Sequence, residues 1–382
     1  MANGPVKIGV ATTVVPKRRT TANGKVIRPS VHYVRLATAA AREGAILYLF
    51  HPHAVNWSRG YVDAWLPRDS SRPSGDWVKR RVEVPDVIYE NVFVHLAIAG
   101  YTASLRRAAQ SRNIPLFNPL LPGKWRMVEI LKRQNLADYS PQTERLQDAE
   151  QAMARIRAWG TAYIKPSGGY GGMDVARVEQ MSNGRYQIAL DRSKTKNGKV
   201  RLHLSEAEFR RWINQRLKRA HLIQRELRLI TVRGRKVDFR VVLHRDLHGD
   251  WQLIGIVPKM AAVGGVVTNL IAGGELLDIE YVRRLAQVEG KYISLELLER
   301  RAKEVAQIIS RRYPYTGHVG FDMAVEEDMS VSMIEMNAKP SRKLLNKQML
   351  QRLATHTAGF AIYLARRRTS QHKQQTNQVV TR

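Results

Sequence analysis

Hydrophobic and polar residues alternate in two neighbouring stretches near the end of the chain, residues 320–325 and 333–340. A period of two is typical of β-strands, and the polar residues between the stretches indicate a turn. The two stretches are therefore predicted to form a β-hairpin. Side chains two positions apart lie on one face of a strand, so Glu335 and Asn337 would point the same way, and Asp322 could join them from the partner strand.

The start of the chain combines apolar runs with one helical pattern. Residues 6–10 and 45–50 are apolar enough for buried strands. Between them, Ser30 is a candidate N-cap, and an apolar stripe at helical spacing follows it as far as Gly44. Strand, helix and strand in this order indicate a parallel α/β arrangement. Further expected elements are a basic loop over 12–28, loop with short strands over 57–84, a strand over 85–90 and a helix over 103–111.

The middle of the chain is predicted to contain an antiparallel sheet. Two Asn-Gly pairs separate its alternating stretches, and Asn-Gly between strands is a strong hairpin signal. Ser205, followed three residues later by Glu208, predicts a capping box at the start of a helix. The other expected elements are helices over 124–131, 148–159, 294–309 and 344–368, and strands over 174–181, 185–190, 199–204, 237–243 and 251–257.

The fold class predicted from these patterns is α/β (α+β) with more than one subdomain, because 382 residues exceed what a single core usually supports. We expect an N-terminal α/β domain over residues 1–120 and a second domain over 121–345, with a hairpin-and-helix lid at about 160–222. A helix over 346–368 and a basic, disordered tail over 369–382 would complete the chain.

Composition narrows the classes of function. The absence of cysteine excludes disulfides, thiolate metal sites and thiol nucleophiles. Neither a signal peptide nor an apolar run of membrane-spanning length is visible, so a soluble protein that stays in the cytoplasm is expected. The net charge of +30 favours acidic partners but does not identify them.

A strand that runs into a glycine-rich loop is the second candidate site. Lys165 leaves the apolar stretch Ala162–Ile164 and precedes a loop in which Tyr170 is unusually bulky. Glycines allow successive N–H groups to surround an anion, and the lysine adds a point charge that suits phosphate. A flexible turn is the alternative. The loop residues assigned to phosphate binding are Ser167, Gly168, Gly169, Gly171 and Gly172.

The oxygen ligands of the hairpin suit a hard divalent cation. Asp322, Glu335 and Asn337 offer carboxylate and amide oxygens, which Mg²⁺ combines with water and substrate phosphates. An ordinary hairpin with these side chains in solvent is the alternative interpretation. Asp238 and Arg240 share one face of a later strand, with Lys259 just beyond the next, and they could equally form a cross-strand ion pair.

Taken in order, these motifs resemble the ATP-grasp superfamily, and most of all its YheC/YheD branch, which is associated with endospore coats. The resemblance covers roughly residues 123–345, and residues 85–90 resemble the branch's pre-grasp strand. It implies an N-terminal pre-grasp domain, a lid and a C-terminal antiparallel-sheet core. The motifs that carry it are the helix at Lys124-Trp125, Pro141-Gln142-Thr143, Ile164-Lys165-Pro166, Asp238-Phe239-Arg240, Thr268-Asn269-Leu270 and Glu335-Met336-Asn337-Ala338-Lys339-Pro340.

The resemblance also implies roles for individual residues. Lys124 and Lys165 would hold the phosphates of ATP under the lid, and Mg²⁺, with Mn²⁺ as the alternative, would be bound by the oxygen ligands of the hairpin. Arg240 and Lys259 would act on the reacting groups. The remaining nucleotide contacts would come from Gln224, Arg225, Glu226, Leu227, Asp238 and Asn269. Arg225 departs from the pattern, because many members have an acidic residue there to hold ribose.

The activity implied by the resemblance is that of an ATP-dependent carboxylate–amine ligase working through an acyl phosphate. The acid and amine stay unknown, and an acidic polypeptide is one possibility for the substrate. The alternative is a non-catalytic, ATP-binding structural protein of the spore coat, so the expected location is the mother-cell cytoplasm or the coat. Specific nucleic-acid binding rests on charge alone, since no recognition motif is visible. His51 and His53 have no third ligand nearby, so no zinc site is expected.

Overall fold

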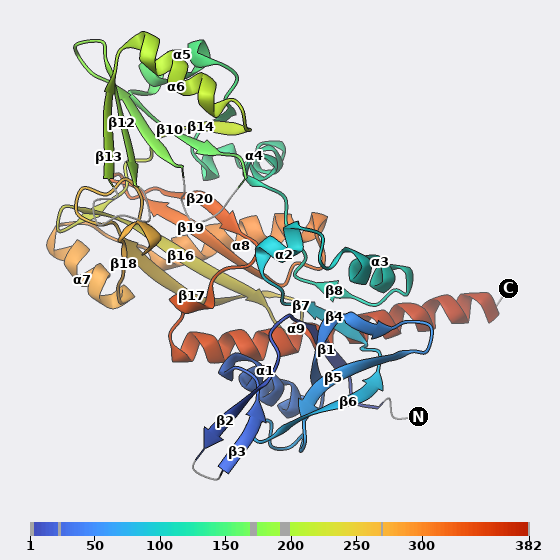
Figure 1. The fold of residues 1–382 in the computed structure, drawn as a ribbon. Helices are drawn as coiled ribbons and strands as arrows, with labels where there is room; N and C mark the ends of the chain where they lie inside the picture. Colours follow the sequence, from blue (N-terminus) through green and yellow to red (C-terminus); the bar gives the residue numbers. More distant parts are fainter. Residues whose placement is uncertain (1–3, 22–23, 169–173, 192–198, 269, 381–382) are drawn as a thin grey trace.

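Three β-sheets organise the chain in the computed structural model, which describes residues 4–21, 24–168, 174–191, 199–268 and 270–380 (Figure 1). The first sheet has the strand order β6-β5-β4-β1-β7-β8. Its strands β1, β4, β7 and β8 pair in parallel, whereas β5 and β6 extend it in antiparallel fashion. Its strands are β1 (Lys7–Ala11), β4 (Ile46–Asn56), β5 (Tyr61–Pro67), β6 (Trp77–Glu83), β7 (Val87–Glu90) and β8 (Leu116–Phe117).

The parallel α/β start predicted from the sequence is confirmed, and the structure adds strands to it. Residues 57–84 form two full strands rather than a loop with short strands, because β5 and β6 pair along their length and bury Val62, Ala64 and Trp77. Residues 12–28, predicted as a loop, contain the hairpin of β2 (Lys17–Thr21) and β3 (Gly24–Arg28). The helices of this part are α1 (Val31–Arg42), α2 (Val94–Ile98) and α3 (Ala103–Ser111).

The second sheet is antiparallel, as predicted, with the order β13-β12-β11-β10-β14-β9. Asn183-Gly184 lies between β11 and β12, whereas Asn197-Gly198 lies outside the described residues. Two helices, α5 (Ala149–Trp159) and α6 (Glu206–Arg216), pack on it around Phe209 and Ile213. The capping box of Ser205 and Glu208 is present at the start of α6. Its strands are β9 (Thr143–Arg145), β10 (Thr161–Pro166), β11 (Ala176–Gln180), β12 (Tyr186–Asp191), β13 (Lys199–Leu204) and β14 (His221–Arg225).

The third sheet contains the predicted acidic hairpin, β19 (His318–Val325) and β20 (Val331–Asn337). Its order is β18-β17-β16-β19-β20, and β15 pairs with β16 beside this path. The long helix α8 (Leu295–Arg312) covers it with the predicted stripe Leu298, Ala302, Val305 and Ile309. Its other elements are α4 (Lys124–Arg133), β15 (Thr231–Val232), β16 (Arg235–Arg245), β17 (Trp251–Met260), β18 (Glu275–Leu276) and α7 (Ile279–Val288), and the short 3₁₀ turns are η1 (Ala137–Tyr139), η2 (Leu270–Ala272) and η3 (Arg342–Leu344).

The last helix, α9 (Lys347–Val380), runs between the first and third sheets and packs against α1, β7 and β16 (Figure 1). The sequence predicted a helix ending at Arg368 and a disordered tail beyond it, and the structure corrects this. Residues 369–380 contain neither glycine nor proline, so nothing in the sequence terminates the helix there. Within the described residues, no helix has the length and apolar character needed to cross a membrane.

Candidate nucleotide-binding site

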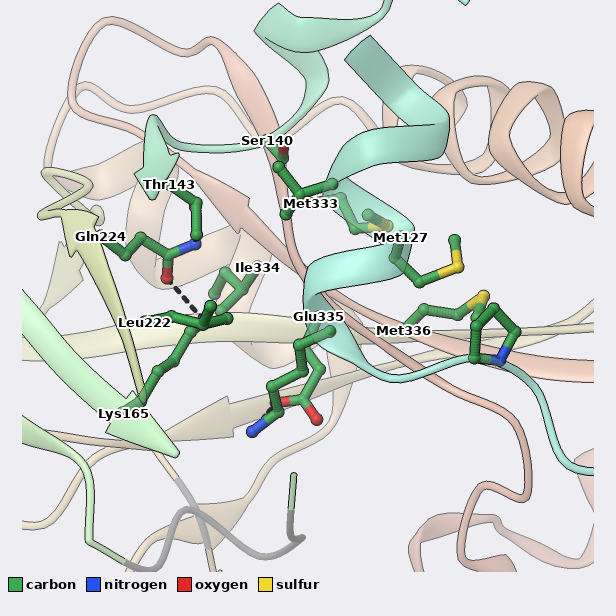
Figure 2. A pocket seen from close by; sticks show the side chains of 13 residues that line it. Met127, Ser140, Thr143, Lys165, Leu222, Gln224, Met333, Ile334, Glu335 and Met336 are labelled. Atoms are coloured by element: carbon green, nitrogen blue, oxygen red, sulfur yellow. Dashed lines mark hydrogen bonds and ion pairs between the residues drawn. The ribbon is translucent and has the colours of Figure 1, made fainter. Parts of the chain in front are cut away.

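A pocket lies where the second sheet faces α4 and the acidic hairpin (Figure 2). It encloses about 430 Å³ of space that protein atoms do not fill, including open solvent at its mouth. Charged and amide groups line part of it, and apolar side chains line the rest. The lining residues are Pro122, Lys124, Met127, Val128, Ser140, Thr143, Lys165, Leu222, Gln224, Met333, Ile334, Glu335 and Met336.

Lys165 enters this pocket from the end of β10. Its Nζ donates a hydrogen bond of 2.7 Å to Gln224 Oε1, and Gln224 Nε2 donates in turn to Thr143 Oγ1 at 2.8 Å. Burial and, to a smaller extent, the charge of Lys124 lower the pKa of Lys165 to about 8, whereas the charge of Glu335 opposes this shift. The ammonium group is thus fixed in place without a carboxylate to neutralise it fully, which prepares it for an anionic ligand.

Lys124 and Glu335 face each other across the pocket. Lys124 is the first residue of α4, and its Nζ lies 3.6 Å from Glu335 Oε2 on β20. Both side chains are largely buried, with exposed fractions of 16% and 28%. Folding therefore brings together two lysines that are 41 positions apart in the sequence and the carboxylate of the distant hairpin.

A second charged cluster continues from the pocket along the third sheet. The strand register places Arg240 opposite Asp322, and Asp322 opposite Glu335. Arg240 donates through Nε and Nη2 to the two oxygens of Asp322 at 2.7 and 3.0 Å, and Lys259 Nζ donates to Asp322 Oδ1 at 2.9 Å. Burial alone would raise the pKa of Asp322, but Lys259 and Arg240 outweigh it and hold that pKa well below its usual range.

Asp238 belongs to the same cluster and is buried. Lys259 Nζ lies 3.0 Å from Asp238 Oδ1, and Thr268 Oγ1 donates to Asp238 Oδ2. Burial raises the pKa of Asp238, and the charge of Lys259 partly offsets that rise. The cross-strand ion pair that the sequence left open for these strands is therefore present, and it joins the hairpin that carries Asp322.

The three side chains predicted to bind a divalent cation lie together on β19 and β20. Asp322 and Glu335 are directly opposite each other, and Asn337 Nδ2 lies 3.3 Å from Asp322 Oδ2. Two carboxylates and an amide are the donors that magnesium shares with water and phosphate oxygens. Within the described ranges, no position is surrounded by three or more His, Cys, Asp or Glu side chains. A metal bound here would therefore need the amide of Asn337 and further ligands from a substrate.

Several residues that the sequence assigned to the nucleotide lie elsewhere. Arg225 is exposed, and Glu226 receives hydrogen bonds from Arg177 and Lys236. Of residues 224–227, only Gln224 lines the pocket. Leu227 lies beyond the end of β14. Ser167 and Gly168 are described next to the pocket strand, whereas Gly169, Gly171, Gly172 and Asn269 lie outside the described residues.

The sequence reasoning missed most of the apolar lining of the pocket. Leu222 lies two positions before Gln224 on β14, so the period of two could have indicated it. Met127 and Val128 lie on α4, one turn after Lys124, and the pattern had assigned them to packing alone. Met336, which lies between Glu335 and Asn337, gave no signal at all.

Comparison with known sequences now assigns the family. The family described as YheC/D like ATP-grasp matches residues 113–364, about two thirds of the chain. The chain belongs to the YheC/D-like ATP-grasp family. This family match confirms the resemblance inferred from the motifs, and it includes both lysines of the pocket and the whole acidic hairpin.

Two curated relatives of this ATP-grasp protein come from Bacillus subtilis (strain 168). The endospore coat-associated protein YheD is 23% identical over 342 residues, which cover 86% of this chain and 72% of YheD. The endospore coat-associated protein YheC is 21% identical over 276 residues, which cover 71% of this chain and 74% of YheC.

Solved structures agree with the fold assignment. D-cycloserine synthetase DcsG matches with a TM-score of 0.52 and 13% identity, over 95% of this chain and 99% of its own. The ATP-grasp ligase PsnB, complexed with the precursor peptide PsnA2 and AMPPNP, matches with a TM-score of 0.50 and 12% identity, over 94% and 98%. At these identities, the matches establish the ATP-grasp fold.

Proposed function

We propose that this protein is an ATP- and magnesium-dependent carboxylate–amine ligase that works through an acyl phosphate. The observation that carries the proposal is the meeting of Lys124, Lys165 and Glu335 in one pocket, beside the cluster of Arg240, Lys259 and Asp322. Phosphoryl transfer needs positioned cations and oxygen ligands more than a protein nucleophile, and this arrangement provides both.

The pocket residues divide this work. Lys165, fixed by Gln224, and Lys124 would neutralise nucleotide phosphates, while Leu222 and Met336 offer apolar surface for the base. Asp322, Glu335 and Asn337 would hold magnesium, which neutralises phosphate charge when bound. Closing the lid would exclude water from the reacting groups.

The basic cluster beyond the pocket would act on the second substrate. Arg240 and Lys259 are already paired with Asp322, so a metal at Asp322 would share that carboxylate with both cations. The two cations are then placed to balance the negative charge that develops when a phosphoryl group moves to a carboxylate. Loss of one such fixed donor typically costs about 3–4 kcal/mol in the barrier.

Nucleotide-dependent stabilisation tests the proposal. Thermal unfolding with and without magnesium ATP should show stabilisation of the wild type, by about 2.7 kcal/mol at a hundred times the dissociation constant. Lys165→Ala should lose this stabilisation. Lys218→Ala is the matched control, because Lys218 is an exposed lysine on the lid side of the molecule. Absence of stabilisation of the wild type at millimolar nucleotide would refute the proposal.

A non-catalytic, ATP-binding protein of the spore coat is the second candidate, favoured by the description of YheD and YheC as endospore coat-associated. The two candidates differ in turnover. Release of ADP that depends on an added acid and amine, and that disappears in Arg240→Gln, would support the ligase. Tight binding of ATP without release of ADP across a panel of acids and amines would support the structural role.

A further inference from the structure

The order of strands in the first sheet reverses between β1 and β7. From β1 the chain continues through α1 to β4 on one side, whereas β7 pairs with the other side of β1, and these pairings are parallel. In sheets of this kind, ligands bind beyond the carboxyl ends of the strands at which the order reverses. Thr12 follows β1 directly and Asn91 follows β7, so these residues mark the place to examine.

The first turn of α1 lies at this reversal point. Tyr33 Oη is 2.7 Å from Thr12 Oγ1 and accepts a hydrogen bond from Asn91 Nδ2 at 3.1 Å. The N-cap residue Ser30 makes no side-chain hydrogen bond to the helix, and the first turn contains no acidic residue. A helix N-terminus attracts anions through its free N–H groups and its dipole. The first turn of α1 has no acidic side chain that could interact with these N–H groups.

Two imidazole nitrogens that are shielded from solvent independently indicate an absent partner. The Nε2 atoms of His32, in the first turn of α1, and of His318, at the start of β19, are shielded from solvent and lack a hydrogen-bond partner among the described residues. Burial, together with the charges of Arg342 and Arg35, lowers the pKa of His32 to about 3. A buried polar atom without a partner costs about 1–3 kcal/mol, and native structures rarely keep one without a reason.

Arg342 supplies a cation at the same place. It follows Asn337 by five residues, and its Nη1 lies 3.3 Å from Asn91 Oδ1. Asn91 in turn donates to Tyr33, the neighbour of His32, which links Arg342 to the first turn of α1. The charge of Arg342 also lowers the pKa of both His32 and His318. The described part of the chain gives Arg342 no carboxylate partner.

Glu90, which directly precedes Asn91, is already neutralised. Glu90 is fully buried, Arg106 donates to both of its oxygens at 2.6 and 2.7 Å, and Lys339 Nζ lies 3.0 Å from Oε1. Glu90 therefore does not supply the negative charge that the α1 N-terminus and Arg342 favour. The positive charge of Arg342 and of the α1 N-terminus is therefore not balanced by a carboxylate of the described residues.

We propose that the N-terminus of α1, His32, His318 and Arg342 form a subsite for a small anionic group, a carboxylate or a phosphate, at the junction of β1 and β7. This inference rests on the proposed function, because Arg342 belongs to the segment that directly follows Asn337, a proposed metal ligand. The anion is a group of the ligase's acidic substrate other than the one that reacts. The neutral imidazoles donate from Nε2, and the guanidinium supplies the charge.

Calorimetric titration of the nucleotide-free protein tests the subsite, with L-glutamate and inorganic phosphate as separate probes at constant ionic strength. Saturable binding in the millimolar range or tighter is expected for one of them. Arg342→Gln should weaken it about tenfold or more, as expected for loss of a charge-assisted hydrogen bond. Lys343→Gln is the matched control, since it removes one charge from the exposed neighbouring residue and should leave affinity unchanged.

A second variant keeps the test decisive if Arg342→Gln unfolds. His32→Phe keeps an aromatic ring but removes Nε2. It should lower the affinity for the same probe and leave the thermal unfolding midpoint unchanged. Tighter binding of glutamate identifies a carboxylate group, and tighter binding of phosphate a phosphate group. Failure of both probes to bind at about 20 mM, or equal weakening by Arg342→Gln and Lys343→Gln, would overturn the subsite.

Lys165→Ala separates this subsite from the nucleotide pocket. Its anion binding should match that of the wild type, whereas its response to ATP is lost. If ATP stabilises the wild type but neither probe binds, the subsite alone is wrong. Loss of probe binding in Lys165→Ala would place the anion in the nucleotide pocket and would also overturn the subsite.

Discussion

At the scale of the residue, Lys165 combines burial with incomplete neutralisation. Its ammonium bonds to a neutral amide, Gln224, while the nearest acidic group, Glu335, is also paired with Lys124. Two lysines therefore share one carboxylate in a largely buried space. Their mutual repulsion is relieved only when more negative charge enters, and this favours a polyanionic ligand such as a triphosphate.

The affinity for ATP is expected to fall as the pH rises through about 8, the pKa of Lys165 in the free protein. The protonated lysine holds phosphate, so binding requires a proton above that pH, and affinity should drop by up to about tenfold per pH unit. Lys165→Arg stays protonated and should show a flatter profile between about pH 7 and 9. Binding titrations at several pH values provide the measurement, and identical profiles would assign the titration to another group.

At the scale of the element, the acidic hairpin is tied closely to the loop that follows it. A Cβ atom added to Gly320 on β19 would lie 2.8 Å from Pro340 Cβ and 3.2 Å from Arg240 Cδ. The loop thus packs directly on the strand that carries Asp322. Lys339, next to Pro340, reaches Glu90 of the first sheet, so the hairpin connects the pocket to the N-terminal part of the chain.

Gly320→Ala should therefore displace this loop and the guanidinium of Arg240. Overpacking of this kind typically costs about 1–3 kcal/mol of stability, and turnover should fall as well because Arg240 moves. Gly255→Ala on β17 is the comparison, since its new methyl group would meet the Met349 side chain, which can bend away. Denaturant unfolding and ADP release measure the two effects. A larger loss in Gly255→Ala would contradict the interpretation.

At the scale of the whole molecule, α9 joins the first and third sheets. Phe360 is fully buried, its ring contacts Phe117 and His244, and a Cβ atom added to Gly317 would lie 2.5 Å from it. The helix thus sits between the parallel sheet and the strands that carry the charged cluster. The relative position of these two parts depends on apolar packing along α9 as well as on the ion pairs around Glu90.

Phe360→Ala is expected to destabilise the protein by about 3–5 kcal/mol, because it removes a buried ring and leaves a cavity at this junction. Phe93→Ala is the matched control, since Phe93 is 57% exposed and its truncation should stay within about 0.5 kcal/mol. Denaturant unfolding of both variants provides the measurement. Comparable losses in the two would show that α9 does not hold the sheets together.

The sequence by itself indicated the family and the local elements outside residues 12–28, 57–84 and 369–380. Strand alternation, Asn-Gly turns and the Ser205 capping box depend on neighbours within a few residues, so they could be read directly. The pairing of Asp322 with Glu335 likewise follows from a short hairpin. The order of the motifs was enough to indicate the ATP-grasp fold, because the motif residues lie at recognisable positions within these elements.

Only the tertiary structure decided which side chains meet. The sequence treated residues 224–227 as one unit, yet folding turns Gln224 into the pocket and Glu226 toward Arg177. It also gave no sign that Arg342 lies near His32, because those residues are more than 300 positions apart. Long-range contacts depend on how sheets and helices pack, and a local pattern carries no information about that packing. Elements with a clear local pattern were readable from the chain, whereas the sites arise where distant elements come together.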